Sequence, residues 1–176
     1  MAYLAFEEKN IESVSEALDI AEDRTGDYYK FSLCQWKRHH YDVKTLMSLA
    51  EDEISSYAFA LLNKYSRVIE DYELNPKTRD FYFICLQDHR ILDAVKRDNN
   101  LTLLPLLVYI FTHELVHIVR FCNFFQRFDI SGQGKEKEER LVHTTTYEIL
   151  RDSSLPKMDY ILESYKQHRL CDWAAS

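Results

Sequence analysis

Two histidines and a glutamate near the middle of the chain have the residue types and the spacing of a metal site. His113, Glu114 and His117 follow the order H-E-x-x-H within Thr112–Arg120 (THELVHIVR). Histidines four residues apart on a helix lie on one face, so both imidazoles can bind the same metal ion. Glu114 is next to the first histidine, where it can polarise a water molecule on that ion. The pattern therefore predicts the core of a zinc hydrolase.

The surroundings of the motif strengthen this interpretation. The segment Leu101–Val119 is apolar on nearly every side of a helix, which predicts burial all round. Two histidines and a carboxylate in such a helix each need a partner, because an unpaired buried charge is costly. A metal ion with a bound water would satisfy all three. The alternative is a pair of core histidines hydrogen-bonded to backbone, with Glu114 paired to Arg120 or another cation.

A third ligand is expected further along the chain, since catalytic zinc usually has three protein ligands and one position open to water. Glu139 and His143 lie four residues apart on a predicted helix, Lys135–Arg151, and Tyr147 follows one turn later on the same face. Either Glu139 or His143 can be the ligand, with the other residue supporting it. Tyr147 or Arg120 could donate a hydrogen bond to an oxyanion, although Tyr147 could equally fill a seam between helices.

The H-E-x-x-H motif, followed after 21 intervening residues by Glu139, resembles the gluzincin branch of the zincin metallopeptidases. The resemblance covers roughly Leu101–Leu150. It implies that His113, His117 and Glu139 bind one zinc ion, that Glu114 is the general base, and that the substrate is a peptide or protein. Several gluzincins have an acidic residue one turn after the ligand glutamate, whereas this chain has His143 there.

The composition fits one folded domain. A chain of 176 residues with 46% apolar and 14% aromatic residues can bury one core and is too short for two comfortable domains. Only three glycines and three prolines favour a helix-rich fold. We therefore expect a helix-dominated α+β fold, with residues 1–176 forming a single zincin-like domain, its metal-site core at about 101–151, and a small β-sheet or hairpin packed on the buried HExxH helix.

The hydrophobic pattern predicts the other elements. The first half of the chain is expected to form a helix over Ile11–Ala21 that stops at Gly26, a β-hairpin of Tyr29–Cys34 with Tyr41–Leu46, and a helix from Ser48 to Tyr72. A strand at Phe81–Leu86 and a helix capped by Asp88 follow, and then the active-site helix from Leu103 to about Phe125. The last part is expected to form a loop at Asp129–Lys135, the helix Lys135–Arg151, and a final helix opened by Pro156 and Lys157. The segment Phe81–Leu86 could instead begin a helix.

Charge, cysteines and the first residues predict a cytoplasmic protein. The net charge of −7 provides no basic surface for nucleic acid. The first ten residues (MAYLAFEEKN) lack the basic start of a signal peptide, and the four scattered cysteines are expected to be reduced thiols. Leu101–Val119 is a membrane-span candidate by length, but its two histidines, its glutamate and Pro105 favour a buried core helix.

Two other functions remain open from the sequence. The spacing of Glu114 and His117 is also that of a carboxylate-bridged, non-haem di-iron site. Such a site needs a second E-x-x-H, which the chain lacks, although Glu51 or Glu53 could contribute a ligand. Alternatively, a zincin-like domain could keep the metal and serve a regulatory or partner-binding role without catalysis. A fourth protein ligand closing the metal sphere would favour that role, whereas the presence of Glu114 argues against it.

Overall fold

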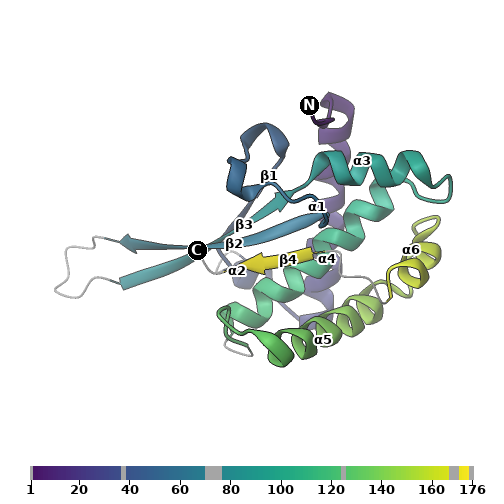
Figure 1. Cartoon of the computed structure of the whole chain (residues 1–176). Helices are drawn as coiled ribbons and strands as arrows, with labels where there is room; N and C mark the ends of the chain where they lie inside the picture. The colour runs from purple at the N-terminus through teal and green to yellow at the C-terminus, as the bar shows by residue number, and fades with distance from the viewer. Residues whose placement is uncertain (1, 37–38, 70–76, 124–125, 167–170, 175–176) are drawn as a thin grey trace.

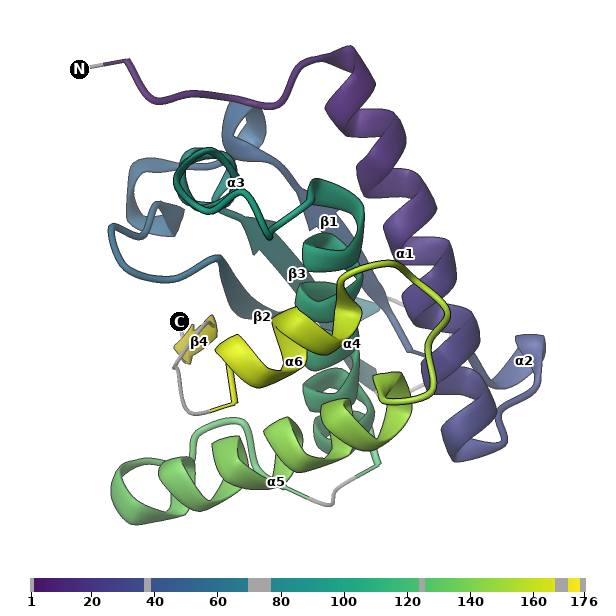
Figure 2. The ribbon, with the colours of Figure 1, turned by 90° about the vertical axis from the view of Figure 1, so that its right-hand side faces the viewer.

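The computed structural model of the chain describes residues 2–36, 39–69, 77–123, 126–166 and 171–174. Its central element is helix α4 (Leu103–Cys122), which has α1 (Glu8–Tyr29), α5 (Gly132–Leu150) and α6 (Met158–Ser164) around it, as Figure 1 and Figure 2 show from two sides. Every residue from Pro105 to Val119 is buried. The predicted burial of this helix on all sides is confirmed.

The ends of α4 follow from its sequence. Pro105 lies in the first turn, where its missing N–H removes no hydrogen bond from the helix. At the other end, the Asn123 side chain donates a hydrogen bond to the carbonyl of Val119 at 2.7 Å, which satisfies one of the last carbonyls. The predicted end near Phe125 lies outside the described residues.

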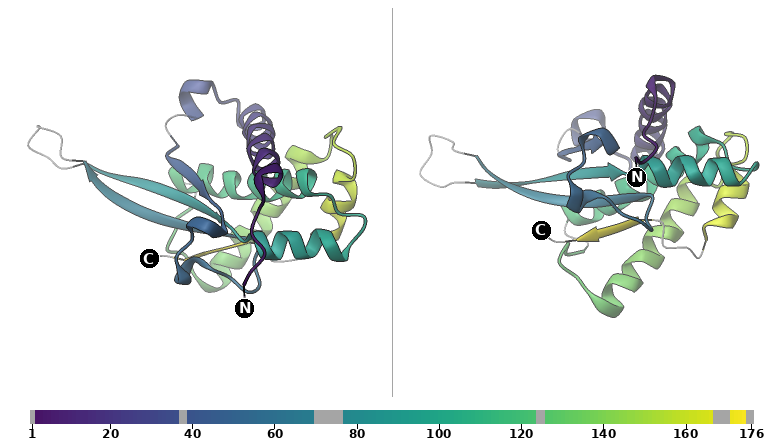
Figure 3. Two further views of the ribbon diagram at one scale, coloured as in Figure 1. Left: turned by 90° about the horizontal axis from the view of Figure 1, so that it is seen from above. Right: turned by 45° about the horizontal axis from the view of Figure 1, so that its top comes forward.

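A mixed β-sheet covers the remaining side of the helices. Its strands β1 (Tyr41–Lys44), β3 (Lys77–Leu86), β2 (Ala60–Ile69) and β4 (Cys171–Ala174) are arranged in that order. β2 and β3 are antiparallel, while β1 pairs with β3 and β4 pairs with β2 in parallel. Leu62 and Ile84 form a buried cross-strand pair within the common hydrophobic core. Seen from above, the far ends of β2 and β3 project beyond the helices (Figure 3). The helix-dominated α+β class is confirmed.

The predicted hairpin between Tyr29–Cys34 and Tyr41–Leu46 is wrong. Tyr29 is the last residue of α1, and the short helix α2 (Leu33–Trp36) follows it. The alternating aromatic residues pack on one another instead of on a sheet, with the Tyr29 and Phe31 rings 5.5 Å apart. Of the two predicted hairpin segments, the second contains a strand, β1, and this strand pairs in parallel with β3, which comes much later in the chain.

Gly26 lies inside α1 and does not end it. A Cβ atom at this position would lie 2.5 Å from the Trp36 indole nitrogen, so the glycine lets the indole approach the helix backbone. The chain instead leaves the helix at Lys30, which has a left-handed backbone (φ 59°).

The predicted helix from Ser48 to Tyr72 is also wrong as far as Ile69, and residues 70–72 lie outside the described residues. The chain makes two short 3₁₀ turns, η1 (Leu46–Ser48) and η2 (Glu51–Glu53), and then enters β2. The Glu53 carboxylate accepts a hydrogen bond from the backbone N–H of Ala50 at 2.9 Å, and it forms an ion pair with Lys44 at 2.8 Å. Pairing with β3 gives the segment after residue 60 its hydrogen bonds, so the tertiary partner overrides the apparent helical spacing.

Several later predictions are confirmed. Phe81–Leu86 is the end of β3, α3 spans Asp88–Arg97, and α6 begins just after Lys157. The loop predicted at Asp129–Lys135 is wrong in its second half, because α5 already begins at Gly132. Ser131 precedes that helix with the extended backbone of an N-cap residue (φ −137°, ψ 171°).

Among the described residues, α4 is the helix with the length and apolar character to cross a membrane. Of its most apolar 18-residue window, 83% is buried inside the protein. This is the property of a core helix, and it is compatible with a soluble protein.

The Asp88 carboxylate joins three distant segments. It accepts hydrogen bonds from the backbone N–H groups of Phe6 at 2.9 Å and Leu46 at 3.0 Å, and the residue is fully buried at the start of α3. It does not cap its own helix, because the N-cap position belongs to Gln87. Its role is to hold the N-terminal segment and the turn after β1 on the core.

We expect Asp88→Ala to lower the free energy of unfolding by about 2–4 kcal/mol, because it leaves buried N–H groups without acceptors. Urea unfolding followed by circular dichroism measures the change. Asp93→Ala is the matched control on the same helix, since the side chain of Asp93 is 44% exposed and forms an exposed ion pair with Arg97 four residues away. That change should cost less than about 0.5 kcal/mol. Equal losses in the two variants would contradict the anchoring role of Asp88.

Candidate functional site

The predicted ligands come together where α4 faces α5. His113 and His117 project from one face of α4, and their Nε2 atoms are 3.2 Å apart. Glu139 of α5 reaches both rings, with Oε1 3.1 Å from His117 Nε2 and Oε2 3.4 Å from His113 Nε2. The two helices therefore bring one carboxylate against two imidazoles that the sequence places more than 20 residues away.

The dimensions of this cluster match those of a zinc site. Ligand atoms about 2.0–2.1 Å from a tetrahedral zinc ion lie roughly 3.3–3.4 Å from one another. The three side chains form a triangle in which neighbouring donor atoms, two nitrogens and both oxygens of the Glu139 carboxylate, are 3.1–3.4 Å apart. Both histidines present Nε2, and a buried nitrogen–nitrogen contact needs a shared proton or a shared cation. The types and spacing of these donors fit a divalent ion.

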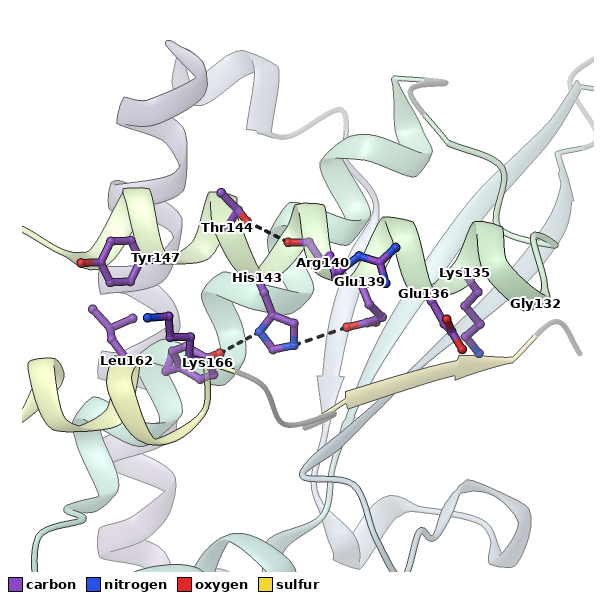
Figure 4. A pocket seen from close by; sticks show the side chains of 11 residues that line it. Gly132, Lys135, Glu136, Glu139, Arg140, His143, Thr144, Tyr147, Leu162 and Lys166 are labelled. Carbon is purple, nitrogen blue, oxygen red and sulfur yellow. Dashed lines mark hydrogen bonds and ion pairs between the residues drawn. The ribbon is translucent and has the colours of Figure 1, made fainter.

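His143 lies at the edge of this triangle. Its Nε2 is 3.7 Å from Glu139 Oε2, and its ring centroid is 4.8 Å from that of His113. Figure 4 shows Glu139 and His143 pointing toward one another from α5. Among the described residues, His113, Glu139 and His143 each offer a ligand atom within 4.8 Å of the other two. His143 is thus close enough to be a fourth ligand or a partner of Glu139.

Tyr109 is a site residue that the sequence analysis missed. It lies one turn before His113 on α4, is 2% exposed, and its hydroxyl is 3.1 Å from His143 Nδ1. The hydrogen bond fixes the orientation of the His143 ring. The signal was present in the sequence, because Tyr109, His113 and His117 recur at intervals of four residues, but a buried tyrosine in an apolar run carries no metal-site pattern of its own.

The Glu139 carboxyl is held in its charged form. Burial alone would raise its pKa, but the charges and hydrogen bonds of His113 and His117 hold the pKa well below its usual range. The side chain is 12% exposed, so this charge is compensated inside the protein and not by bulk water. A metal ion would supply that compensation directly.

Glu114 is 1% exposed and lies on α4 beside the first histidine. Its charge is felt at Cys85 on β3: burial first, and then the charges of Glu53 and Glu114, raise the pKa of the Cys85 thiol to about 12. The Glu114 carboxylate is therefore within electrostatic range of the sheet, while the two histidines face α5.

The two candidates for an oxyanion donor have different surroundings. Tyr147 is 46% exposed, lies on α5 beyond His143, and lines a cavity beside the cluster, so it is accessible to a ligand. Arg120 forms a bidentate ion pair with Glu138, in which Nη2 donates a hydrogen bond to Oε2 at 3.0 Å and Nε donates one to Oε1. Glu138 lies near the start of α5 within a run of charged residues, but it is 3% exposed and is neutralised by Arg120.

The same ion pair fixes the relative position of the two site helices. Arg120 comes one turn after His117 on α4, and Glu138 is the residue before Glu139 on α5. A planar guanidinium bound to both carboxylate oxygens allows little rotation or sliding. The pair therefore sets which face of α5 is turned toward the histidines, and it acts as a positioning contact.

A cavity of about 1010 Å³ opens beside Glu139 and His143. It is lined mainly by α5, with Tyr109 of α4, Leu162 of α6 and Lys166 completing the wall (Figure 4). His113 and His117 are fully buried, whereas the side chain of His143 is 14% exposed. A ligand would therefore approach the cluster from the side of Glu139 and His143.

Comparison with known proteins identifies no relative. No family model matches the chain, and neither does any curated protein or solved structure. The gluzincin resemblance stays a prediction, and the interpretation of the site depends on its geometry.

We expect Arg120→Met to lower the free energy of unfolding by about 3 kcal/mol, since it leaves the buried Glu138 carboxylate without its cation. The double variant Arg120→Met/Glu138→Leu should recover at least half of this loss, because it removes the uncompensated charge. Urea unfolding of the three proteins measures both changes.

Arg127→Met is the matched control, because the ion pair of Arg127 with Asp129 is exposed (84% and 61%). It should change the free energy of unfolding by less than about 0.5 kcal/mol. If the double variant were no more stable than Arg120→Met alone, the ion pair would not be the source of the loss.

Proposed function

We propose that the protein is a zinc-dependent hydrolase that acts on peptide bonds, with His113, His117 and Glu139 as the metal ligands. The observation that supports this most is the triangle of three side chains on α4 and α5, in which neighbouring donor atoms are 3.1–3.4 Å apart. Core histidines bonded to backbone would not need a carboxylate at the same point. A divalent ion accounts for all three side chains together.

Each residue then has a chemical role. A bound zinc ion would polarise a carbonyl and lower the pKa of a water molecule. Glu114 would accept a proton from the attacking water at its carboxylate and return it to the leaving amine nitrogen as the C–N bond breaks. Tyr147, on the cavity wall, would donate a hydrogen bond from its hydroxyl to the carbonyl oxygen as negative charge develops there.

The closeness of His143 supports a second candidate, a metal-binding module without catalysis. If His143 were a fourth ligand beside Glu139, the metal sphere would be closed and no water could bind. The domain would then serve a regulatory or partner-binding role. The longer separation of 3.7 Å between His143 Nε2 and Glu139 Oε2 favours the open site.

The non-haem di-iron alternative has weaker support. Of the acidic residues that could add ligands, Glu53 is already ion-paired with Lys44 and accepts a hydrogen bond from the Tyr65 hydroxyl at 3.0 Å. Glu51 is exposed in η2. A di-iron site would need one of them to move into the cluster. Iron content with an oxygen-dependent visible absorption band would support it.

Protein purified without added metal is expected to contain about one zinc ion per chain, because the ligand triangle is formed by the fold itself. Inductively coupled plasma mass spectrometry measures the content. His117→Ala should reduce it to a trace, whereas His89→Ala should leave it unchanged, since His89 lies on α3 and contacts the Ser55 carbonyl at 3.1 Å. Equal zinc in wild-type protein and His117→Ala would remove the basis of the proposal.

Glu114→Gln is expected to keep the zinc and to lower peptide hydrolysis by about 10²- to 10⁴-fold, the usual contribution of a general base. Release of fluorescence from a mixture of quenched peptides measures the rate. Glu136→Gln is the matched control, because Glu136 lines the cavity but contributes no ligand atom to the cluster. Undiminished hydrolysis by Glu114→Gln would disprove its role as base. A different result would support the non-catalytic metal-binding module: His143→Ala would abolish zinc binding, and wild-type protein would hydrolyse no peptide.

A further inference from the structure

The cavity beside the metal cluster has a different charge from the rest of the protein. The chain carries a net charge of −7, yet Lys135, Arg140 and Lys166 all line this cavity. The opposing carboxylates are Glu136 and Glu139. Because Glu139 is turned toward the histidines, Glu136 is the lining carboxylate left to balance the cations.

The three cations are not equivalent. Lys135 is ion-paired with Asp172 of β4 at 2.6 Å, and both side chains are mostly buried, so its charge is already compensated. Arg140 and Lys166 are exposed and form no ion pair with the residues that the structure describes. In the view of Figure 4, the His143 ring lies between Lys166 on one side and Arg140 on the other. Both cations therefore line the cavity, Arg140 from α5 and Lys166 from just after α6, without an ion-pair partner among the described residues.

We infer that this cavity binds a carboxylate of the substrate through Arg140 and Lys166, so that the protein acts on short acyl compounds that carry a negative charge near the bond to be broken. This inference rests on the proposed hydrolase function. An arginine guanidinium can bind both oxygens of a carboxylate, and a lysine ammonium adds a second point of attraction from the other side. The arrangement would hold the substrate by its charged end with its carbonyl toward the cluster.

The size of the cavity limits the substrate. A volume of about 1010 Å³ is at the upper end of sites for small molecules, and it suits a ligand of a few residues. Tyr147 and Leu162 provide aromatic and apolar wall for a side chain between the charged end and the metal. A carboxylate of such a ligand can come from a free C-terminus or from an acidic side chain, and both sources present the same chemistry to the two cations.

The test measures binding in the zinc-loaded Glu114→Gln protein, in which the ligand is not consumed. Three probes of equal length are compared by isothermal titration calorimetry: N-acetyl-alanyl-alanine, its C-terminal amide, and the C-terminal amide of N-acetyl-alanyl-glutamate, in which the side-chain carboxylate is the only free carboxylate. At least one carboxylate probe should bind about tenfold more tightly than the neutral amide. Preference for the first identifies a C-terminal carboxylate, and preference for the third identifies an acidic side chain.

Substitution then identifies the cations. Arg140→Gln and Lys166→Gln, each in the same background, should weaken binding of the preferred carboxylate by about three- to tenfold and leave binding of the neutral amide unchanged. Lys137→Gln is the matched control, because Lys137 is exposed on α5 and does not line the cavity. It removes the same charge and should have little effect.

Failure of this inference can be told apart from failure of the proposed function. Equal binding of all three probes, or a carboxylate preference that survives both substitutions, would overturn the carboxylate site even if zinc-dependent hydrolysis were observed. A carboxylate preference that both substitutions reduce would support it even if wild-type protein hydrolysed none of the probes, and only the hydrolase assignment would then be withdrawn.

Discussion

The fold depends on how charge is compensated in its dry interior. Burying a carboxylate is costly unless a partner is buried with it. Asp88 has backbone N–H groups, Glu53 has Lys44, and Glu138 has Arg120. Glu139 differs, because its partners are two imidazoles, which are cations only when they carry an extra proton. Among these four carboxylates, Glu139 is therefore the one whose charge balance can change with protons or, in the proposed zinc site, with a bound metal ion.

The two adjacent glutamates of α5 have different partners and therefore different roles. Glu138 is bound to a permanent cation and so holds the helix in place at any ordinary pH. Glu139, one residue later, faces a set of partners whose charge depends on protons or metal. Because successive residues on a helix project about 100° apart, a fixed contact at one of them determines where the other points. Precise placement of Glu139 thus does not require the metal to organise the helix.

The local sequence pattern predicted the elements whose tertiary contacts favour the same secondary structure. It failed where pairing with a distant segment determines the secondary structure. The all-apolar sequence of α4 can be buried on every side only as a core helix, and Glu139 with His143 had to share a face once α5 was a helix. β2 was misjudged because Leu61, Leu62 and Tyr65 fit a helical face as well as a strand, and pairing with β3 resolves the ambiguity. Neither the Glu138–Arg120 contact nor the Tyr109–His143 contact has a sequence signature, since each depends on the angle between two helices.

The hydrogen bond between Tyr109 and His143 bears on whether the metal site is open. If the tyrosine hydroxyl donates to Nδ1, then Nε2 of a neutral His143 ring carries the proton and faces Glu139 Oε2 at 3.7 Å, so this nitrogen cannot bind a metal ion. If the hydroxyl instead accepts from Nδ1–H, then Nε2 is unprotonated and can bind the metal as a fourth ligand. Glu139 favours the first arrangement, because its charged carboxylate, held at low pKa by His113 and His117, attracts a donor on Nε2. In the proposed zinc site, the carboxylate that would bind the metal would thereby keep His143 out of the coordination sphere, and a position would remain for water and substrate.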